Sequence, residues 1–228
     1  MVTVKLLLKI YGSKERAFHS AEVLVSNELK ELDASAEFSV SDDNWLMVDI
    51  NGEDSEFVSN FLIQKFGTPV TELARNEVYT GVIDQIHDNE FIVDVGTLVS
   101  IPQKNLAILG SGTANQIATR FGIIKHLPVK IQITDEKAKL GAFTKPQADI
   151  WWNWKKSEQD RVIANSVTRS ELKAAIKKTG HARDIYGIER LGLMEHMITC
   201  REKTDGPGIV AAIGRLVKGD LGVIRTSN

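Results

Sequence analysis

Basic side chains in the central and C-terminal parts of the chain carry its clearest chemical signal. Lysine and arginine neutralise phosphate groups, so a surface on which they gather attracts the backbone of a nucleic acid. Lys173, Lys177 and Lys178 recur at a spacing that places at least two of them on the same side of a helix. The residues expected to contact phosphates are Lys104, Arg120, Lys125, Lys130, Lys155, Lys156, Lys173, Lys177, Lys178 and Arg183. The alternative is that these exposed cations only keep the protein soluble.

Three tryptophans, Trp151, Trp152 and Trp154, directly precede Lys155 and Lys156. Aromatic rings next to lysines can stack on nucleic-acid bases while the lysines bind phosphates. The same rings can instead fill the junction between two folded units, because each tryptophan carries a large apolar area. We prefer the packing interpretation and expect all three rings to lie mostly buried between the central and C-terminal units.

No arrangement typical of a catalytic or cofactor site is present in the sequence. The five histidines form no HxH or HExxH pattern, no GxGxxG follows an expected strand, and no GxxxxGK[ST] occurs. The polar loop Gly110–Thr113 precedes a helix and is a minor candidate for phosphate binding. The single cysteine, Cys200, excludes an internal disulfide and a multi-cysteine metal site. We therefore expect a protein without enzymatic activity, cofactor or metal.

The segment Asp205-Gly206-Pro207-Gly208 has two interpretations. It is similar to the strand-loop-helix signature of amino-acid-sensing regulatory domains, in which the loop holds a small effector at a helix N-terminus. It also has the composition of an ordinary helix start, with an aspartate cap and a proline in the first turn. We favour the cap, because this spacing is common in capped helices.

Short alternating segments in the middle of the chain predict a small β-barrel. Val78–Ile86 and Phe91–Val95 alternate on either side of the turn dipeptide Asp88-Asn89, which is typical of a hairpin. A third apolar run, a helical insert near residues 114–121 and a late strand at Pro128–Ile133 follow. About five short strands with one helical insert indicate an oligonucleotide-binding (OB) type of barrel.

Both ends of the chain predict the order strand, helix, strand, strand, helix. The first part begins with a strand at Val4–Tyr11, and the last part has a capping box at Thr168–Glu171 and a final strand at Leu221–Arg225. This order is that of the ferredoxin-like split βαβ unit. The predicted fold is α+β, with a central small OB-like barrel at residues 78–145. Ferredoxin-like units are expected on either side of it, at residues 1–77 and 146–228.

Composition and charge indicate a globular protein whose two ends meet different partners. Apolar residues make up 43% and charged residues 25% of the 228 residues, and the net charge is −2. Residues 1–77 carry a net charge of −7, residues 78–145 one of +1 and residues 146–228 one of +4. The acidic first unit either docks a protein or is merely a solvated surface, and we favour the latter. The first apolar run is too short for a membrane span, and the cysteine usage favours the cytoplasm.

Residues 160–214 resemble the C-terminal signature of an uncharacterised archaeal protein family of unknown function. The resemblance rests on the run Ile188–His196, on Cys200 and on the loop Thr204–Gly208, and it extends over most of the chain. It implies an archaeal cytoplasmic protein and brings no activity or site residues with it. The positions that resemble the strands and loops of nucleic-acid-binding barrels are Gly81, Asp94, Gly96, Ile101, Pro102 and Leu106.

The sequence thus predicts a non-enzymatic RNA-binding or ribosome-associated protein that acts in archaeal information processing. The basic barrel and C-terminal unit would bind RNA or a ribonucleoprotein, and the acidic unit would stay off the nucleic acid. One alternative is a transcription-associated factor that binds RNA polymerase through the acidic unit. Another is an RNA-modifying enzyme, which we disfavour because neither a cofactor loop nor a nucleophile with its base is visible.

Overall fold

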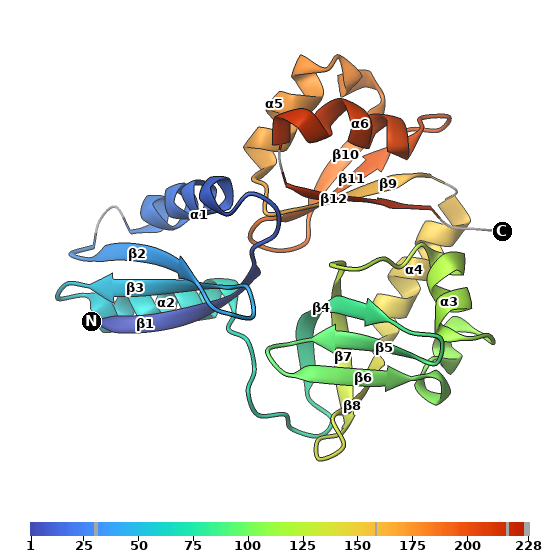
Figure 1. Cartoon of the computed structure of the whole chain (residues 1–228), viewed down its shortest axis with the longest axis horizontal. Coiled ribbons are helices and arrows are strands. Elements are labelled where there is room, and N and C mark those ends of the chain that lie inside the picture. Colours follow the sequence, from blue (N-terminus) through green and yellow to red (C-terminus); the bar gives the residue numbers. More distant parts are fainter. Residues whose placement is uncertain (30–31, 158, 218, 226–228) are drawn as a thin grey trace.

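The structure is a computed structural model that describes residues 1–29, 32–157, 159–217 and 219–225. It is a mixed α+β protein with a three-stranded sheet, a closed five-stranded barrel and a four-stranded sheet, in that order along the chain (Figure 1). The predicted α+β class and central barrel are therefore confirmed. Of the helices in the described ranges, none is both long and apolar enough to cross a bilayer.

The N-terminal unit is an antiparallel sheet in the order β1-β3-β2 with two helices. Its elements are β1 (Val2–Lys9), α1 (Lys14–Glu28), β2 (Ser35–Val40), β3 (Trp45–Asn51) and α2 (Ser55–Phe66). Alternate residues of β1, namely Val4, Leu6 and Leu8, are buried in a core with the helices. Because strand side chains alternate, Leu7 and Lys9 belong to the opposite face of the sheet.

The barrel closes because its first strand pairs with its fourth, giving the order β4-β5-β6-β8-β7. Its strands are β4 (Val78–Ile86), β5 (Glu90–Asp94), β6 (Leu98–Pro102), β7 (Pro128–Asp135) and β8 (Leu140–Phe143). Between β6 and β7 lie the 3₁₀ turns η1 (Gln103–Asn105) and η2 (Ala107–Leu109) and the helix α3 (Ala114–Phe121). At Gly81 an added Cβ would lie 2.5 Å from the Asp94 carbonyl oxygen, so β4 and β5 approach too closely there for a side chain.

Helix α4 (Lys145–Ser157) packs on the barrel through Ala148 and Trp151. Trp151 is fully buried and meets Phe143 edge-on at 4.7 Å between ring centroids. Trp152 and Trp154 are half-buried against the same core. The packing interpretation is thus confirmed for Trp151. The expected division at residue 146 had assigned α4 to the C-terminal unit, whereas the helix shares the barrel's core.

Tryptophan fluorescence should report this burial. We expect blue-shifted emission that iodide quenches poorly in the native protein, with a red shift on unfolding in guanidinium, because Trp45 and Trp151 are excluded from water. Adding RNA should leave the emission nearly unchanged. Strong RNA-dependent quenching of freely accessible tryptophans would instead favour base stacking.

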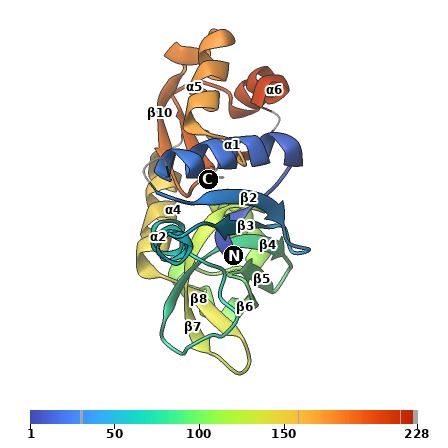
Figure 2. The ribbon, with the colours of Figure 1, turned by 90° about the vertical axis from the view of Figure 1, so that its left-hand side faces the viewer.

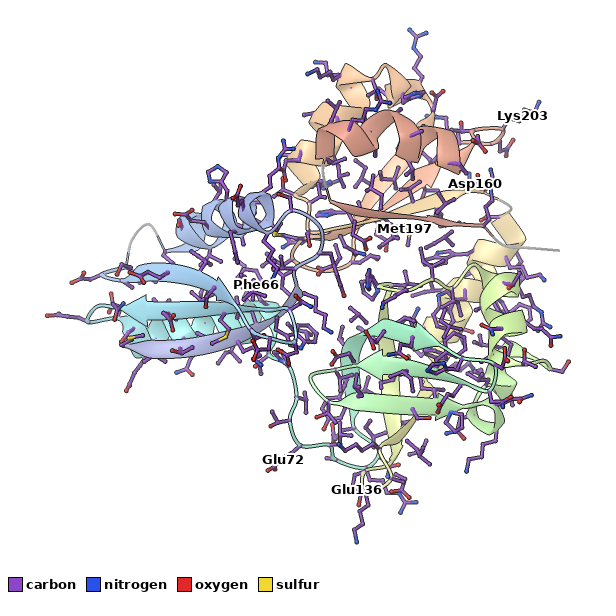
Figure 3. All side chains as sticks on the ribbon, in the orientation of Figure 1. Phe66, Glu72, Glu136, Asp160, Met197 and Lys203 are labelled. Atoms are coloured by element: carbon purple, nitrogen blue, oxygen red, sulfur yellow. The ribbon has the colours of Figure 1, made fainter. Side chains whose placement is uncertain are left out.

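The C-terminal unit is an antiparallel four-stranded sheet in the order β10-β11-β9-β12. Its elements are β9 (Arg161–Asn165), α5 (Arg169–Lys178), η3 (His181–Arg183), β10 (Ile185–Arg190), β11 (Glu195–Cys200), α6 (Gly206–Val217) and β12 (Asp220–Ile224). One face, with Val162 and Ile198, packs under α5 and α6. The other face, with Ile163 and Met197, joins the barrel core, and Figure 3 shows Met197 on the barrel side. Both faces are covered, which explains why all of β9 is buried.

Direct contacts hold the three units together. Leu193 and Met194, in the turn between β10 and β11, insert into the core of the N-terminal unit. Arg16 of α1 donates a hydrogen bond to the Leu216 carbonyl oxygen of α6 at 2.8 Å. Figure 2 accordingly shows α1 next to the helices of the C-terminal unit. The interfaces between the units, and not only the units themselves, therefore position side chains.

Candidate functional site

The predicted basic residues gather most clearly on α5. Its apolar side, with Leu172 and Ile176, is buried, and its exposed side carries lysines. We define the α5 surface as five exposed cations on α5 and η3, namely Arg169, Lys173, Lys177, Lys178 and Arg183. Glu171, the acidic residue of this helix, accepts hydrogen bonds from Thr168 in the predicted capping box and from Ser20 of α1.

The remaining predicted cations do not join the α5 surface. Figures 1 and 2 show α5 on the side of the C-terminal sheet that faces away from the barrel. Lys104, Lys125 and Lys130 are exposed on the barrel, while Lys155 and Lys156 lie at the end of α4. Arg120 donates to the carbonyl oxygens of Leu109 and Ser111, at 3.3 and 2.8 Å, and so holds the loop before α3 in place. Phosphate contacts by these residues stay predictions.

The Asp205–Gly208 segment forms a helix cap. The backbone N–H of Gly208 donates to Asp205 Oδ2 at 2.9 Å, and that of Gly206 donates to Asp160 Oδ2 at 2.8 Å. Arg225 forms ion pairs with both carboxylates. The first N–H groups of α6 thus have partners within the protein, as the cap interpretation requires.

A cavity of about 560 Å³ lies where the three units meet, and we call it the junction cavity. It is lined by Lys9 and Trp45 from the N-terminal sheet, Gly81 and Val82 from β4, and Arg190 and Glu195 from the hairpin of β10 and β11. Phe66, at the end of α2, also lines it, and Figure 3 shows this residue on the part of the N-terminal unit nearest the other two. Cavities of 300–1,000 Å³ between units are common small-molecule sites.

A buried ion pair joins the N-terminal sheet to the barrel at this cavity. Lys9 of β1 and Asp94 of β5 are only 8% and 6% exposed, and Lys9 Nζ donates to Asp94 Oδ2. The Gly96 N–H donates to the other carboxylate oxygen at 2.8 Å. Lys9 Nζ also lies 4.9 Å from the centroid of the Trp45 ring, within reach of a cation–π interaction. Lys9 is therefore neutralised and held in place by groups of the protein itself.

Glu195 is a second buried ionisable residue at the cavity. The residue is 5% exposed, and its carboxyl accepts a hydrogen bond from the Met194 N–H at 3.1 Å. Burial raises the pKa of Glu195 to about 7. Its neighbour His196 belongs to the opposite face of β11, where burial, with the charges of Arg190 and Arg169, lowers its pKa to about 4. Glu195 is thus uncharged in much of the protein at neutral pH, and His196 is neutral.

A chain of side-chain contacts joins one residue from each unit. Tyr11 stacks on His126 with 4.0 Å between ring centroids, and His126 Nδ1 donates to Asp220 Oδ2 at 2.8 Å. The hydrogen bond from His126 lowers the pKa of Asp220, whereas burial raises the pKa of Tyr11. Among the residues that the structure covers, the Tyr11 hydroxyl has no hydrogen-bond partner.

The junction cavity was not predicted from the sequence, although two signals of it are present there. Lys9 interrupts the apolar run Leu6–Ile10, and Glu195 stands in an otherwise apolar strand. A charged residue in such a run is normally buried only with a partner, which is a reason to search for one. Cys200 is a buried core residue, and burial raises its pKa to about 11. Within the described ranges, no group of three or more His, Cys, Asp or Glu side chains is placed to hold a metal ion.

Comparison with known proteins identifies the family. The DUF2110 N-terminal domain matches residues 3–72, the DUF2110 central domain residues 73–155 and the DUF2110 C-terminal domain residues 159–225. No curated protein matches the chain. The central match extends to residue 155, so it includes most of α4, which shares the barrel's core. The chain therefore belongs to the DUF2110 family and contains all three of its domains.

Proposed function

We propose that this protein is a non-enzymatic RNA-binding protein, associated with the ribosome or another ribonucleoprotein, that contacts phosphates through the α5 surface. The observation that carries the proposal is the exposure of five cations on α5 and η3. Glu171, within the same segment, is engaged in the capping box. Such a surface supplies affinity for a phosphate backbone without requiring a particular sequence.

The order of the strands supports an OB-type barrel and ferredoxin-like units, and these folds suit a protein that binds RNA. The order β4-β5-β6-β8-β7, with α3 between β6 and β7, supports an OB-type barrel. The orders β1-β3-β2 and β10-β11-β9-β12 support ferredoxin-like units, the first without its last strand. An archaeal and cytoplasmic setting belongs to the same proposal and rests on the family resemblance described above.

We place the RNA on α5 and not on the barrel for an electrostatic reason. OB barrels bind oligonucleotides with their second and third strands and with the loops after the first and fourth. Here these parts carry Asp88, Glu90, Asp135 and Glu136 beside Lys137 and Lys139. Figure 3 shows Glu136 at the end of the barrel remote from the C-terminal unit. This side of the barrel would repel a phosphate backbone.

A second candidate function is supported by the N-terminal unit. Phe57 of α2 is 61% exposed and stacks on Phe61, and the exposed residues Glu53 and Glu56 precede it. An exposed aromatic pair next to acidic residues suits contact with a protein better than contact with RNA. A transcription-associated role, with RNA polymerase as the partner, is the alternative in that case. Pull-down from a native lysate separates the two candidates by recovering ribosomal or polymerase subunits.

Reversing the charges of α5 should weaken RNA binding strongly. In the variant Lys173→Glu/Lys177→Glu/Lys178→Glu, acidic side chains replace the three lysines while the buried side of α5 is unchanged. We expect its affinity for fluorescein-labelled ribosomal RNA fragments, measured by anisotropy, to fall at least about 100-fold at low salt. The thermal midpoint should shift little, because exposed substitutions change stability by about 0.5 kcal/mol or less.

A matched control distinguishes local contacts from overall charge. The variant Arg75→Glu/Lys137→Glu/Lys145→Glu makes the same change in net charge at exposed positions outside the C-terminal unit. It should retain most of the affinity for RNA. If both variants lose affinity equally, binding depends on net charge and the α5 surface has no special role.

A further inference from the structure

The junction cavity has features that the packing of the three units does not explain. Its volume of about 560 Å³ is enough for a ligand of several rings, and its wall contains groups from every unit. Lys65, Thr80 and Arg190 are exposed members of this wall. The cavity is therefore accessible from solvent, although Lys9, Trp45 and Glu195 deeper in the wall are buried.

The charges at the cavity favour an anion. Lys9 is neutralised by Asp94, and Glu195 has a pKa near neutrality, so neither adds a full charge at pH 7. Arg190 is an exposed cation in the wall. Arg190 Nε donates to the Gly192 carbonyl oxygen at 2.8 Å, which orients the guanidinium group beside the cavity. A guanidinium held in this way is suited to phosphate, which it can bind through two parallel hydrogen bonds.

The rest of the wall favours a flat, mostly apolar body with polar edges. Phe66, Val82 and Leu191 supply apolar surface, and Phe66 has Lys65 Nζ 5.8 Å from its ring centroid. The Glu195 carboxyl can both donate and accept, as the edge of a nucleobase requires.

We propose that the junction cavity binds one nucleotide, with its phosphate at Arg190 and its base against Phe66 and the carboxyl of Glu195. The ligand is either a free nucleotide or the terminal nucleotide of an RNA. This site is separate from the α5 surface, and it does not depend on whether that surface binds RNA.

Binding of mononucleotides tests the proposal. Isothermal titration calorimetry with AMP, GMP, CMP and UMP should give a dissociation constant below about 1 mM for at least one of them, and the matching nucleoside should bind at least about tenfold more weakly. A dinucleotide with a terminal phosphate should bind as well as the mononucleotide if the source is an RNA end, and more weakly if it is a free nucleotide. Either result agrees with the proposal. The absence of binding by all four mononucleotides would overturn it.

Two variants locate the binding within the cavity. Arg190→Ala removes the phosphate contact, and Thr80→Trp fills the cavity from an exposed position without removing a buried group. Both should bind the mononucleotide at least about tenfold more weakly, with circular dichroism spectra like that of the wild type. Undiminished binding in both variants would place the ligand elsewhere and overturn the proposal.

Two further variants test the base contact and the independence of the site. Glu195→Gln should change which of the four bases binds tightest, and an unchanged ranking would overturn the assigned orientation of the base. The α5 variant with three glutamates should bind the mononucleotide like the wild type. Retained nucleotide binding together with lost RNA binding would support both proposals, whereas loss of nucleotide binding in that variant would contradict the separation of the two sites.

Discussion

Replacing Lys9 by methionine is expected to lower the free energy of unfolding by about 3 to 5 kcal/mol. The substitution removes the counter-charge of Asp94, a residue that is only 6% exposed between the N-terminal sheet and the barrel. A buried charge that has lost its partner is far more costly than the intact pair is stabilising. Urea unfolding of the two proteins, compared at the same pH, measures the difference.

Two control variants test whether the loss of stability arises because the ion pair is buried. In Lys9→Met/Asp94→Asn the uncharged amide can still accept the Gly96 N–H, so most of the lost stability should return. Lys5 lies on the same face of β1 and pairs with Asp43 at 3.3 Å, but its side chain is 39% exposed. Lys5→Met should therefore cost only about 0–1 kcal/mol. Equal, small losses for Lys5→Met and Lys9→Met would contradict the structural role of the buried pair.

The pH dependence of stability should change in opposite directions when Glu195 and His196 are replaced. Burial raises the pKa of Glu195 to about 7. Its contribution to the free energy of unfolding is therefore fully present below pH 4.5 and is lost as the pH rises to about 7. Burial lowers the pKa of His196 to about 4. Its contribution to the free energy of unfolding is therefore present above pH 6.5 and is lost as the pH falls to about 4. Between pH 4.5 and 6.5 the two effects oppose each other and nearly cancel in the wild type.

Single substitutions remove this cancellation. Relative to the wild type, Glu195→Gln should make stability rise with pH by about 1.4 kcal/mol per unit across this window, because only the histidine effect remains. His196→Gln should make stability fall with pH at about the same rate. Urea unfolding at several pH values between 4.5 and 6.5 gives the three slopes, and groups common to all three proteins cancel in the comparison. Parallel curves for the three proteins would contradict the assigned burial of both groups.

Local patterns were sufficient to predict most of the elements. The alternation in Val78–Ile86 and Phe91–Val95 predicted the first barrel hairpin, and the capping box at Thr168 predicted the start of α5. These features depend on residues that are close in the sequence, where periodicity and capping act directly. The predicted cations of α5 also lie together for this reason, because neighbouring turns of one helix place them there.

Features formed by residues distant in the sequence could not be predicted. The ion pair of Lys9 with Asp94 joins residues 85 positions apart, and Glu195 reaches the same cavity from a third unit. The large apolar area of Trp151 indicated a buried position but did not show that α4 shares the barrel's core. Arg120 is expected from the sequence to contact phosphates, which stays a prediction, but its hydrogen bonds to the carbonyl oxygens of a nearby loop could not be foreseen. Such assignments depend on tertiary contacts that sequence spacing does not encode.

The salt dependence of RNA binding tests the proposed function most directly. The measurement compares wild type with the variant carrying glutamate at Lys173, Lys177 and Lys178, using isolated ribosomal subunits or ribosomal RNA at increasing salt concentrations. For the wild type, the logarithm of the binding constant should fall linearly with the logarithm of the salt concentration. For the variant the slope should be shallower by about 2 to 3. With three fewer phosphate contacts, binding of the variant releases fewer counterions. Equal binding of both proteins at every salt concentration would contradict the account.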